Sequence, residues 1–299
     1  MGGIDADARG AVQPQPVPQA LVDPLTRPAA PVTSEGQPPR RGHRPRHGEP
    51  VVKRALSLLG AFDSDHVALS LTELGRRTDI PMTSVLRLAG QLEHWGALER
   101  RADGKFVVGL RLWQTGALSP RGHGLQRVAM PYMGDLAQVT RQHVLLAVRD
   151  GDEAMLVERL SDHQAASVLY IVGGRLPLHS TGVGLALLAF ADPGLQAEFL
   201  ARPLVHEPEN VPVSPAALRR TLADIRRDGL ATVHRTAYSV VSVAAPIFGS
   251  DDQVVAALSV IVPEKGAEPR LLGPAVRTAA RSISRGLGAS RSIGVTPAA

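Results

Sequence analysis

Apolar and polar residues recur at helical spacing over residues 70–96, which predicts two short helices joined by a tight turn. Ser70 and Glu73 have the spacing of a capping box, so the first helix should begin just after this serine. Asp79 tolerates the left-handed backbone of such a turn, and Pro81 has the fixed φ that suits a helix start. The residues of the second helix that should face a core are Val85, Leu88, Ala89, Leu92 and Trp95. The pattern is that of a helix-turn-helix unit.

The other face of the second helix carries Thr83, Ser84, Arg87 and Gln91, together with Met82. Short hydroxyl, guanidinium and amide side chains are chemically suited to DNA phosphates and base edges. For these residues alone, an ordinary helical hairpin with a solvated polar face is the alternative interpretation.

A hairpin is expected directly after the second helix. Residues 98–110 form two short apolar runs around Asp103 and Gly104, and an Asp-Gly pair favours a type I′ turn with positive φ at both central residues. A basic hairpin is usually a solvated turn, but directly after a helix-turn-helix unit it is typical of a wing that contacts the DNA backbone. The predicted DNA-binding residues are Thr83, Ser84, Arg87, Gln91, Arg100, Arg101 and Lys105.

The pattern after residue 112 predicts a second domain that mixes helices and strands. A helical connector is expected over residues 112–140, and further helices over 181–191, 215–229 and 270–287. Strands are expected over residues 143–150, 153–160, 167–174, 242–248 and 254–262. Hairpins of antiparallel strands combined with helices indicate an α+β domain.

Three stretches of the chain resemble the IclR-type bacterial transcriptional regulators, over about residues 51–288. Residues 51–112 contain the opening helix VVKRALSLLGAF and the helix-turn-helix with its hairpin. Residues 174–191, GRLPLHSTGVGLALLAFA, are similar to the family's PLH…G.GKA.LA pattern, and residues 225–263 to its Gya…svAaPv…vaalsv pattern. The resemblance implies an N-terminal winged helix-turn-helix domain and a C-terminal GAF-like (profilin-like) α+β effector domain. It implies a sequence-specific DNA-binding regulator whose affinity is modulated by a small-molecule effector.

The resemblance places one wall of the effector pocket at the start of the 181–191 helix. It implies effector contacts from Gly182 and Val183, polar groups from Ser242 and Ser259, and an apolar wall from Val168. Glycines at a helix start also expose N–H groups beside the positive end of the helix dipole, which suits an effector with a hydrogen-bond acceptor. In the alternative interpretation, the glycines only permit tight packing and the serines only cap strands.

The chain departs from the family pattern at several positions. Leu185 stands where the family has a lysine, and residues 232–236, TVHRT, lack the usual acidic residue. Ser242 aligns with the thiol that some relatives place in the pocket. These departures indicate an effector less polar than the small oxo-acids of some relatives, or a degenerate pocket.

Composition narrows the possible classes of protein. The 299 residues suffice for two domains with their own cores, and the absence of cysteine excludes disulfides and thiolate metal sites. No apolar stretch reaches about 18 residues, so we expect no membrane span and a cytoplasmic protein. The net charge of +5 mildly favours a polyanionic partner.

Residues typical of catalysis do not form a recognisable constellation. His179, Ser180 and Asp192 suggest a triad, but no G-x-S-x-G nucleophile elbow accompanies them. The glycines at residues 182–184 lack the third glycine of a dinucleotide motif, and the histidines lack metal-ligand spacing. We therefore expect no enzyme activity, no metal and no cofactor.

The expected organisation has five parts. They are a disordered Pro/Arg-rich tail over 1–49, the winged domain over 50–111, a helical linker over 112–127, the effector domain over 128–290 and a flexible end over 291–299. Arg40, Arg41, Arg44 and Arg46 of the tail are suited to nonspecific phosphate contacts. A solvated leader or an over-extended start codon is the alternative for this tail.

The expected partners are duplex DNA with a pseudo-palindromic operator, a small-molecule effector that carries a hydrogen-bond acceptor, and further copies of the chain. A single winged module buries too little surface for tight specific binding, which favours a dimer or a dimer of dimers. The alternative function is an effector-independent DNA-binding or scaffolding protein whose sensor-like domain serves oligomerisation or partner binding.

Overall fold

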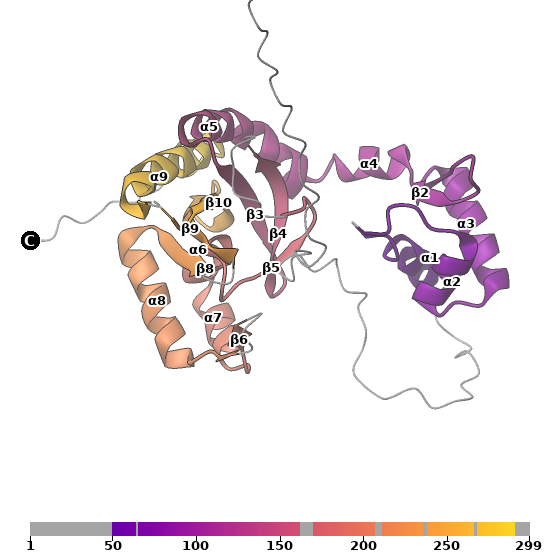
Figure 1. Ribbon diagram of the computed structural model, residues 1–299, viewed down its shortest axis with the longest axis horizontal. Helices are drawn as coiled ribbons and strands as arrows, with labels where there is room; N and C mark the ends of the chain where they lie inside the picture. Colours follow the sequence, from indigo (N-terminus) through magenta and orange to yellow (C-terminus); the bar gives the residue numbers. More distant parts are fainter. Residues whose placement is uncertain are drawn as a thin grey trace, which may run out of the picture.

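The computed structural model describes residues 50–63, 65–161, 170–206, 211–235, 238–265 and 268–290. The predicted tail (1–49), the predicted C-terminal segment (291–299) and Val168 lie outside these residues. Figure 1 shows a small N-terminal part joined through a short helix to a larger part built around a sheet.

The N-terminal part is a helix-turn-helix followed by a two-stranded wing. Its elements are α1 (Val51–Leu59), α2 (Leu71–Thr78), α3 (Met82–Trp95), β1 (Leu98–Arg100) and β2 (Phe106–Val108). An isolated bridge between Leu69 and Phe106 ties the start of α2 to the wing. The fully or nearly buried residues that form its core include Leu58, Leu69, Leu74, Ile80, Val85, Leu88, Ala89, Leu98 and Phe106.

The local signals that delimit these helices are confirmed. The Ser70 hydroxyl accepts the Glu73 N–H, and the Glu73 carboxylate accepts the Ser70 N–H at 2.8 Å, which completes the capping box. Asp79 ends α2 in the left-handed region with φ 54°, and Gly96 ends α3 with φ 85°. Pro81 is the residue before α3 rather than its first residue.

Two expectations for this part are wrong. Trp95 does not face the core: its side chain is 41% exposed, and the Arg111 guanidinium lies 4.7 Å from the centre of its ring. The wing turn is not type I′, because only Gly104, with φ 80°, has positive φ, whereas Asp103 does not. The Gly104 N–H donates to the Arg101 carbonyl at 2.9 Å, so a turn of ordinary hand precedes a left-handed glycine, as in three-residue hairpin loops.

The connector is interrupted rather than continuous. It consists of α4 (Leu110–Gly116), a π-helical turn, η2 (Pro120–Gly124), and α5 (Leu125–Thr140). The predicted single helical stretch over residues 112–140 is therefore wrong between Gly116 and Pro120, where the chain turns.

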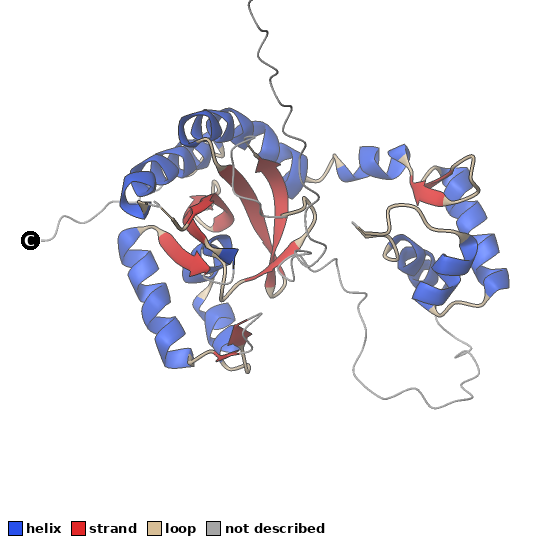
Figure 2. Cartoon of the chain, viewed as in Figure 1, coloured by secondary structure: helices blue, strands red, loops and turns tan. Residues whose placement is uncertain are grey.

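The larger part is an antiparallel six-stranded sheet in the order β5-β4-β3-β10-β9-β8. The strands are β3 (His143–Asp150), β4 (Glu153–Leu160), β5 (Arg175–Pro177), β8 (Ala231–Arg235), β9 (Val240–Phe248) and β10 (Val254–Pro263). Helices α5 and α9 (Pro269–Gly286) cover one face of the sheet, as Figure 2 shows. Helices α6 (Gly182–Ala189), α7 (Pro193–Leu200) and α8 (Pro215–Asp228) lie on the other side, around a separate core.

Helix α6 is buried along its entire length, which explains why all of its residues are apolar. Its N-cap is Thr181, whose hydroxyl accepts the Gly184 N–H at 3.1 Å. Helix α6 packs against the sheet, where it contacts β9 and β10.

Several predicted elements of this part differ in the structure. In the predicted third strand over residues 167–174, the described residues 170–174 form a loop with a turn, and the edge strand is β5 instead. Strand β8, helix α7 and the two-residue strands β6 (Val205–His206) and β7 (Val211–Pro212) were not expected. The helix expected over residues 181–191 ends at Ala189, and the Asp192 carboxylate caps α7 by accepting the Gly194 N–H at 2.8 Å.

Candidate DNA-binding surface and effector pocket

The outward face of α3 carries most of the residues expected to contact DNA. Thr83, Arg87 and Gln91 are exposed, whereas Ser84 is half-buried. Gly90 is also exposed on this helix, and no atom of the chain lies within 4 Å of the position that a Cβ would take there. Because Val85, Leu88 and Ala89 are buried on the opposite side, the polar face is fixed outward by the packing of the core.

The wing presents basic side chains whose orientations are partly fixed by the hairpin. The Arg100 guanidinium lies over the Phe106 ring, 5.5 Å from its centre, and Arg101 lies 3.9 Å from the Asp103 carboxylate. Lys105 is half-buried at the end of the turn. Exposed pairs such as Arg101–Asp103 contribute little energy, so this arginine can exchange its partner for a phosphate.

Asp63 joins the loop after α1 to α2. It accepts hydrogen bonds from Arg77 at 2.5 Å and from the His66 ring at 2.7 Å. Burial alone would raise the pKa of Asp63, but the His66 hydrogen bond and the Arg77 charge outweigh it and hold the pKa below its usual value. These contacts orient α2 relative to α1.

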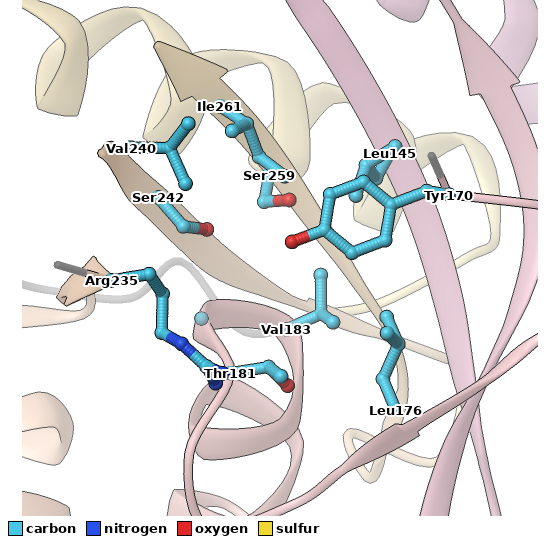
Figure 3. Close-up of a pocket in the computed structure, with 11 residues that line it drawn as sticks. Leu145, Tyr170, Leu176, Thr181, Val183, Arg235, Val240, Ser242, Ser259 and Ile261 are labelled. Carbon is cyan, nitrogen blue, oxygen red and sulfur yellow. The ribbon is translucent and has the colours of Figure 1, made fainter. Parts of the chain in front are cut away.

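The larger part contains a narrow pocket between α6 and the sheet. Figure 3 shows side chains from β8, β9, β10, α6 and the loop before β5 converging on it. Its polar lining residues are Tyr170, Thr181, Arg235, Ser242 and Ser259. Its apolar walls are formed by Leu145, Leu176, Val183, Val240 and Ile261.

The structure brings together four of the five residues expected to contact an effector. Gly182, Val183, Ser242 and Ser259 all line the pocket, whereas Val168 lies outside the described residues. The Gly182 and Val183 N–H groups stand at the first two positions of α6 and have no hydrogen-bond partner among the described residues.

The two glycines at the start of α6 have different roles. At Gly184, a Cβ would lie 2.4 Å from the Pro177 carbonyl oxygen, so close packing against backbone excludes a side chain there. At Gly182, a Cβ would lie 2.3 Å from the Ser242 hydroxyl, on the pocket wall itself. The packing interpretation therefore holds for Gly184, and a side chain at Gly182 would intrude on the pocket.

Ser259 supplies an unusual polar group. Ser259 is fully buried, and its hydroxyl has no hydrogen-bond partner in the part of the chain that the structure describes. An unpaired buried hydroxyl costs about 1–3 kcal/mol, which makes the pocket a place where a bound acceptor or donor would be stabilised.

Sequence reasoning missed seven of the eleven residues that line the pocket, among them the polar residues Tyr170, Thr181 and Arg235. In the sequence, residues 232–236 stand out only for their lack of an acidic residue, but Arg235, the fourth residue of this segment, is buried and lines the pocket. Leu185, in contrast, packs in the core and does not line the pocket. The expectation of a less polar effector or a degenerate pocket rested on Leu185 and on the missing acidic residue; it stays a prediction, and the buried Arg235 adds a cationic side chain to the pocket lining.

Residues 119–285 match the family described as bacterial transcriptional regulator IclR C-terminal, and residues 51–102 match the IclR helix-turn-helix domain. The chain belongs to the IclR family. The matches cover both the winged part and the sheet that holds the pocket.

Relatives of this IclR-family chain are transcriptional regulators. The HTH-type transcriptional regulator KipR of Bacillus subtilis is 29% identical, over 80% of this chain and 97% of its own. The HTH-type transcriptional repressor AllR of Escherichia coli K12 is 28% identical, over 83% of this chain and 97% of its own. Among solved structures, an IclR homolog from Microbacterium hydrocarbonoxydans, complexed with 4-hydroxybenzoate, is 35% identical with a TM-score of 0.74, over 80% of this chain and 99% of its own.

The family membership and the fold establish a helix-turn-helix DNA-binding transcriptional regulator with an effector-binding domain. Within the residues that the structure describes, none of the helices is both long and apolar enough to cross a bilayer.

Proposed function

We propose that this regulator binds a pseudo-palindromic operator through α3 and the wing, and that a small molecule in the α6 pocket changes its operator affinity. The observation that carries the proposal is the outward polar face of α3, held by a capped and well-packed helix-turn-helix, in the same chain as a pocket with unpaired polar groups. As the partner is chromosomal DNA, we place its action in the cytoplasm, and we assign the chain no catalytic role.

In this proposal the residues of α3 divide into two roles. Arg87 lies one helical turn after Thr83 on the exposed face, so its guanidinium is placed to contact a guanine edge with two hydrogen bonds. Thr83, Ser84 and Gln91 are placed for phosphates or neighbouring bases. The wing residues Arg100, Arg101 and Lys105 contact the backbone beside the groove and contribute mainly to affinity.

We further propose that the operator-binding form is a dimer or a dimer of dimers. Large apolar side chains are exposed on α1, on α4 and on the turn after α4, including Val52 (70%), Leu56 (60%), Trp113 (65%) and Leu118 (80%). Apolar side chains that together form a contiguous exposed patch commonly mark a protein interface. A second copy of the chain covering them would place two α3 helices on half-sites about 34 Å apart, or a multiple of that distance.

The effector is proposed to bind with a hydrogen-bond acceptor at the start of α6. The Gly182 and Val183 N–H groups supply donors beside the positive end of the helix, and Ser242 and Ser259 supply hydroxyls. The Microbacterium homolog, which binds 4-hydroxybenzoate, shares the fold of this pocket region, so small organic acids are the first probes to use.

The test compares two glycine substitutions in the full-length protein. Operator DNA is first selected from random duplexes, and its affinity is measured with and without 4-hydroxybenzoate and a panel of other small carboxylates. Gly182→Val should abolish the response to the active probe, because its side chain would overlap the space of Ser242. Gly134→Val is the control, since Gly134 is exposed and a Cβ there meets no atom within 4 Å.

The two variants separate the possible outcomes. A response retained in Gly134→Val and lost in Gly182→Val, with basal operator binding kept in both, supports the proposed pocket. An equal response in both variants would place the effector elsewhere. A wild-type protein that binds its operator but responds to no probe would favour the effector-independent alternative.

A further inference from the structure

We infer that Leu86 and Met82 of α3 recognise the methyl groups of thymine bases in the operator. This inference rests on the proposed function, because it concerns the same DNA-binding helix. It adds an apolar base contact to the polar contacts proposed for Thr83 and Arg87. It also specifies a feature of the operator, a thymine close to the guanine that Arg87 contacts.

Two large apolar side chains are exposed on the first two turns of α3. Leu86 is 59% exposed and Met82 is 46% exposed, and neither belongs to the core of the winged part. Val85, Leu88 and Ala89 fill that core from the opposite side of the helix. The packing of the helix-turn-helix therefore does not explain why these two positions carry large apolar side chains.

Leu86 shares the exposed face of α3 with residues proposed to contact DNA. Residues three and four apart lie on the same side of a helix, so Leu86 lies beside Thr83 and Gly90, and Met82 precedes it by one turn. Arg87, the next residue, is exposed as well. A Cβ at Gly90 would meet no atom of the described residues within 4 Å, so a bound duplex has open space beside Leu86.

Met82 is positioned by the first helix of the helix-turn-helix. A Cβ at Gly75 of α2 would lie 3.5 Å from the terminal methyl group of Met82, which places that methyl over α2. The rest of the side chain stays partly exposed one turn before Leu86. The flexible thioether of methionine fits irregular surfaces well. Met82 and Leu86 thus form an apolar strip along one side of the polar face of α3.

Thymine is the base whose major-groove surface matches this apolar strip. It presents a C5-methyl group there, whereas cytosine presents an amino group and the purines present hydrogen-bonding atoms. Covering the methyl group removes apolar surface from water, whereas covering a polar group with leucine leaves it without a hydrogen-bond partner. Because base pairs are about 3.4 Å apart, we expect the thymine within roughly two base pairs of the guanine contacted by Arg87.

The test removes the methyl group of one base at a time. Operator duplexes selected by the full-length protein are synthesised with each thymine replaced in turn by uracil, which keeps every hydrogen-bonding group and lacks only the C5-methyl. The affinity of each duplex is measured by fluorescence anisotropy at fixed salt concentration. For at least one thymine near the Arg87-dependent guanine, uracil should weaken wild-type binding roughly 4-fold, the effect of one buried methyl group lost.

Variants of the strip assign this effect to its side chains. Leu86→Ala should bind the thymine and uracil duplexes equally at that position, and Met82→Ala should reduce the difference in part. Leu86→Met, which keeps a long apolar side chain, should retain most of it. Leu110→Ala is the matched control, because Leu110 is 61% exposed but lies in α4. It should keep the full thymine-to-uracil ratio, whatever its effect on overall affinity.

The outcomes separate this inference from the proposed function. If uracil has no effect at any position, or if the thymine preference survives in folded Leu86→Ala, the inference is wrong while specific operator binding stands. If Leu86→Ala lowers the mass measured by light scattering and keeps the thymine preference, the strip contacts a second copy of the chain and the inference fails. If no specific sequence is selected from random duplexes, operator recognition by α3 fails and the inference fails with it.

Discussion

Gly90 offers a direct test of what stabilises α3, the helix proposed to contact DNA bases. It lies in the interior of α3 on the exposed face, its φ is not positive, and a Cβ there would meet no atom of the chain within 4 Å. Neither backbone conformation nor packing requires glycine at this position. Gly90→Ala should therefore stabilise the helix-turn-helix by about 0.5–1 kcal/mol, the difference in helix propensity between the two residues.

The assay can follow this part of the chain selectively. The two tryptophans of the protein, Trp95 and Trp113, lie at the end of α3 and in α4, so their fluorescence reports on the winged part and its connector. In urea, the free energy of unfolding of a small unit falls by about 1–2 kcal/mol per molar. The midpoint of the unfolding transition should therefore rise by roughly 0.3–1 M, without a change in this slope.

Gly109→Ala is the control of opposite sign. A Cβ at Gly109 would lie 2.2 Å from the Gly96 carbonyl oxygen, which is backbone and cannot move aside, so this variant should be destabilised. Gly90 also lies beside Arg87 and Gln91, so the added methyl should weaken operator binding even as stability rises. A lower midpoint for Gly90→Ala would refute the propensity argument, and unchanged operator affinity would show that DNA does not approach this position.

Three further outcomes are expected. Ser70→Ala should destabilise the winged part by about 1 kcal/mol at neutral pH. The Ser70 N–H and hydroxyl both donate to the Glu73 carboxylate and hold its pKa below the usual range in the folded state. The variant keeps the N–H but loses the hydroxyl, so the hydroxyl's contribution is present above the usual pKa of the carboxyl and is lost as pH falls through the folded pKa; the urea midpoints of wild type and variant should therefore move closer together in acid. Arg87→Ala should lower operator affinity by about 1–3 kcal/mol and relax the preference at one base pair. Lys105→Ala should instead weaken binding to all DNA sequences alike and reduce the slope of log affinity against log salt concentration by about one. Binding titrations on specific and random duplexes measure both effects. Trp113→Glu should shift the mass measured by light scattering toward that of the monomer. An unchanged mass at micromolar concentration would exclude the exposed apolar side chains of α4 from the dimer contact.

Short-range features were predictable because their causes lie within a few residues. The capping box of Ser70 and Glu73, the left-handed Asp79 and the hairpin at Gly151 each depend on neighbours along the chain, and each is present in the structure. The wing was placed correctly for the same reason, although its turn type was wrong. One left-handed glycine suffices when the loop has three residues, and the Asp-Gly pair alone does not determine loop length.

The side chain of Trp95 shows where periodicity fails. Helical spacing placed it with Leu88 and Leu92, but α3 ends at this residue and its last turn extends beyond the core. Arg111, from the following helix, supplies the aromatic contact and donates to the Trp95 carbonyl at 3.0 Å. A residue 16 positions away decided the environment of this side chain.

The two-part organisation, the helix-turn-helix with its wing and the resemblance that locates four pocket residues could all be predicted from the sequence. Only the tertiary structure could assign the pocket's charge. Strands β9 and β10 are buried on both faces over most of their length, so no alternation of polar and apolar residues distinguishes the face that carries Ser242 and Ser259. Arg235 reaches the same cavity because β8 pairs with β9 and its guanidinium meets the loop before α6, 55 residues earlier in the chain. Sheet register and helix docking, which are long-range contacts, therefore decided which chemistry this pocket presents.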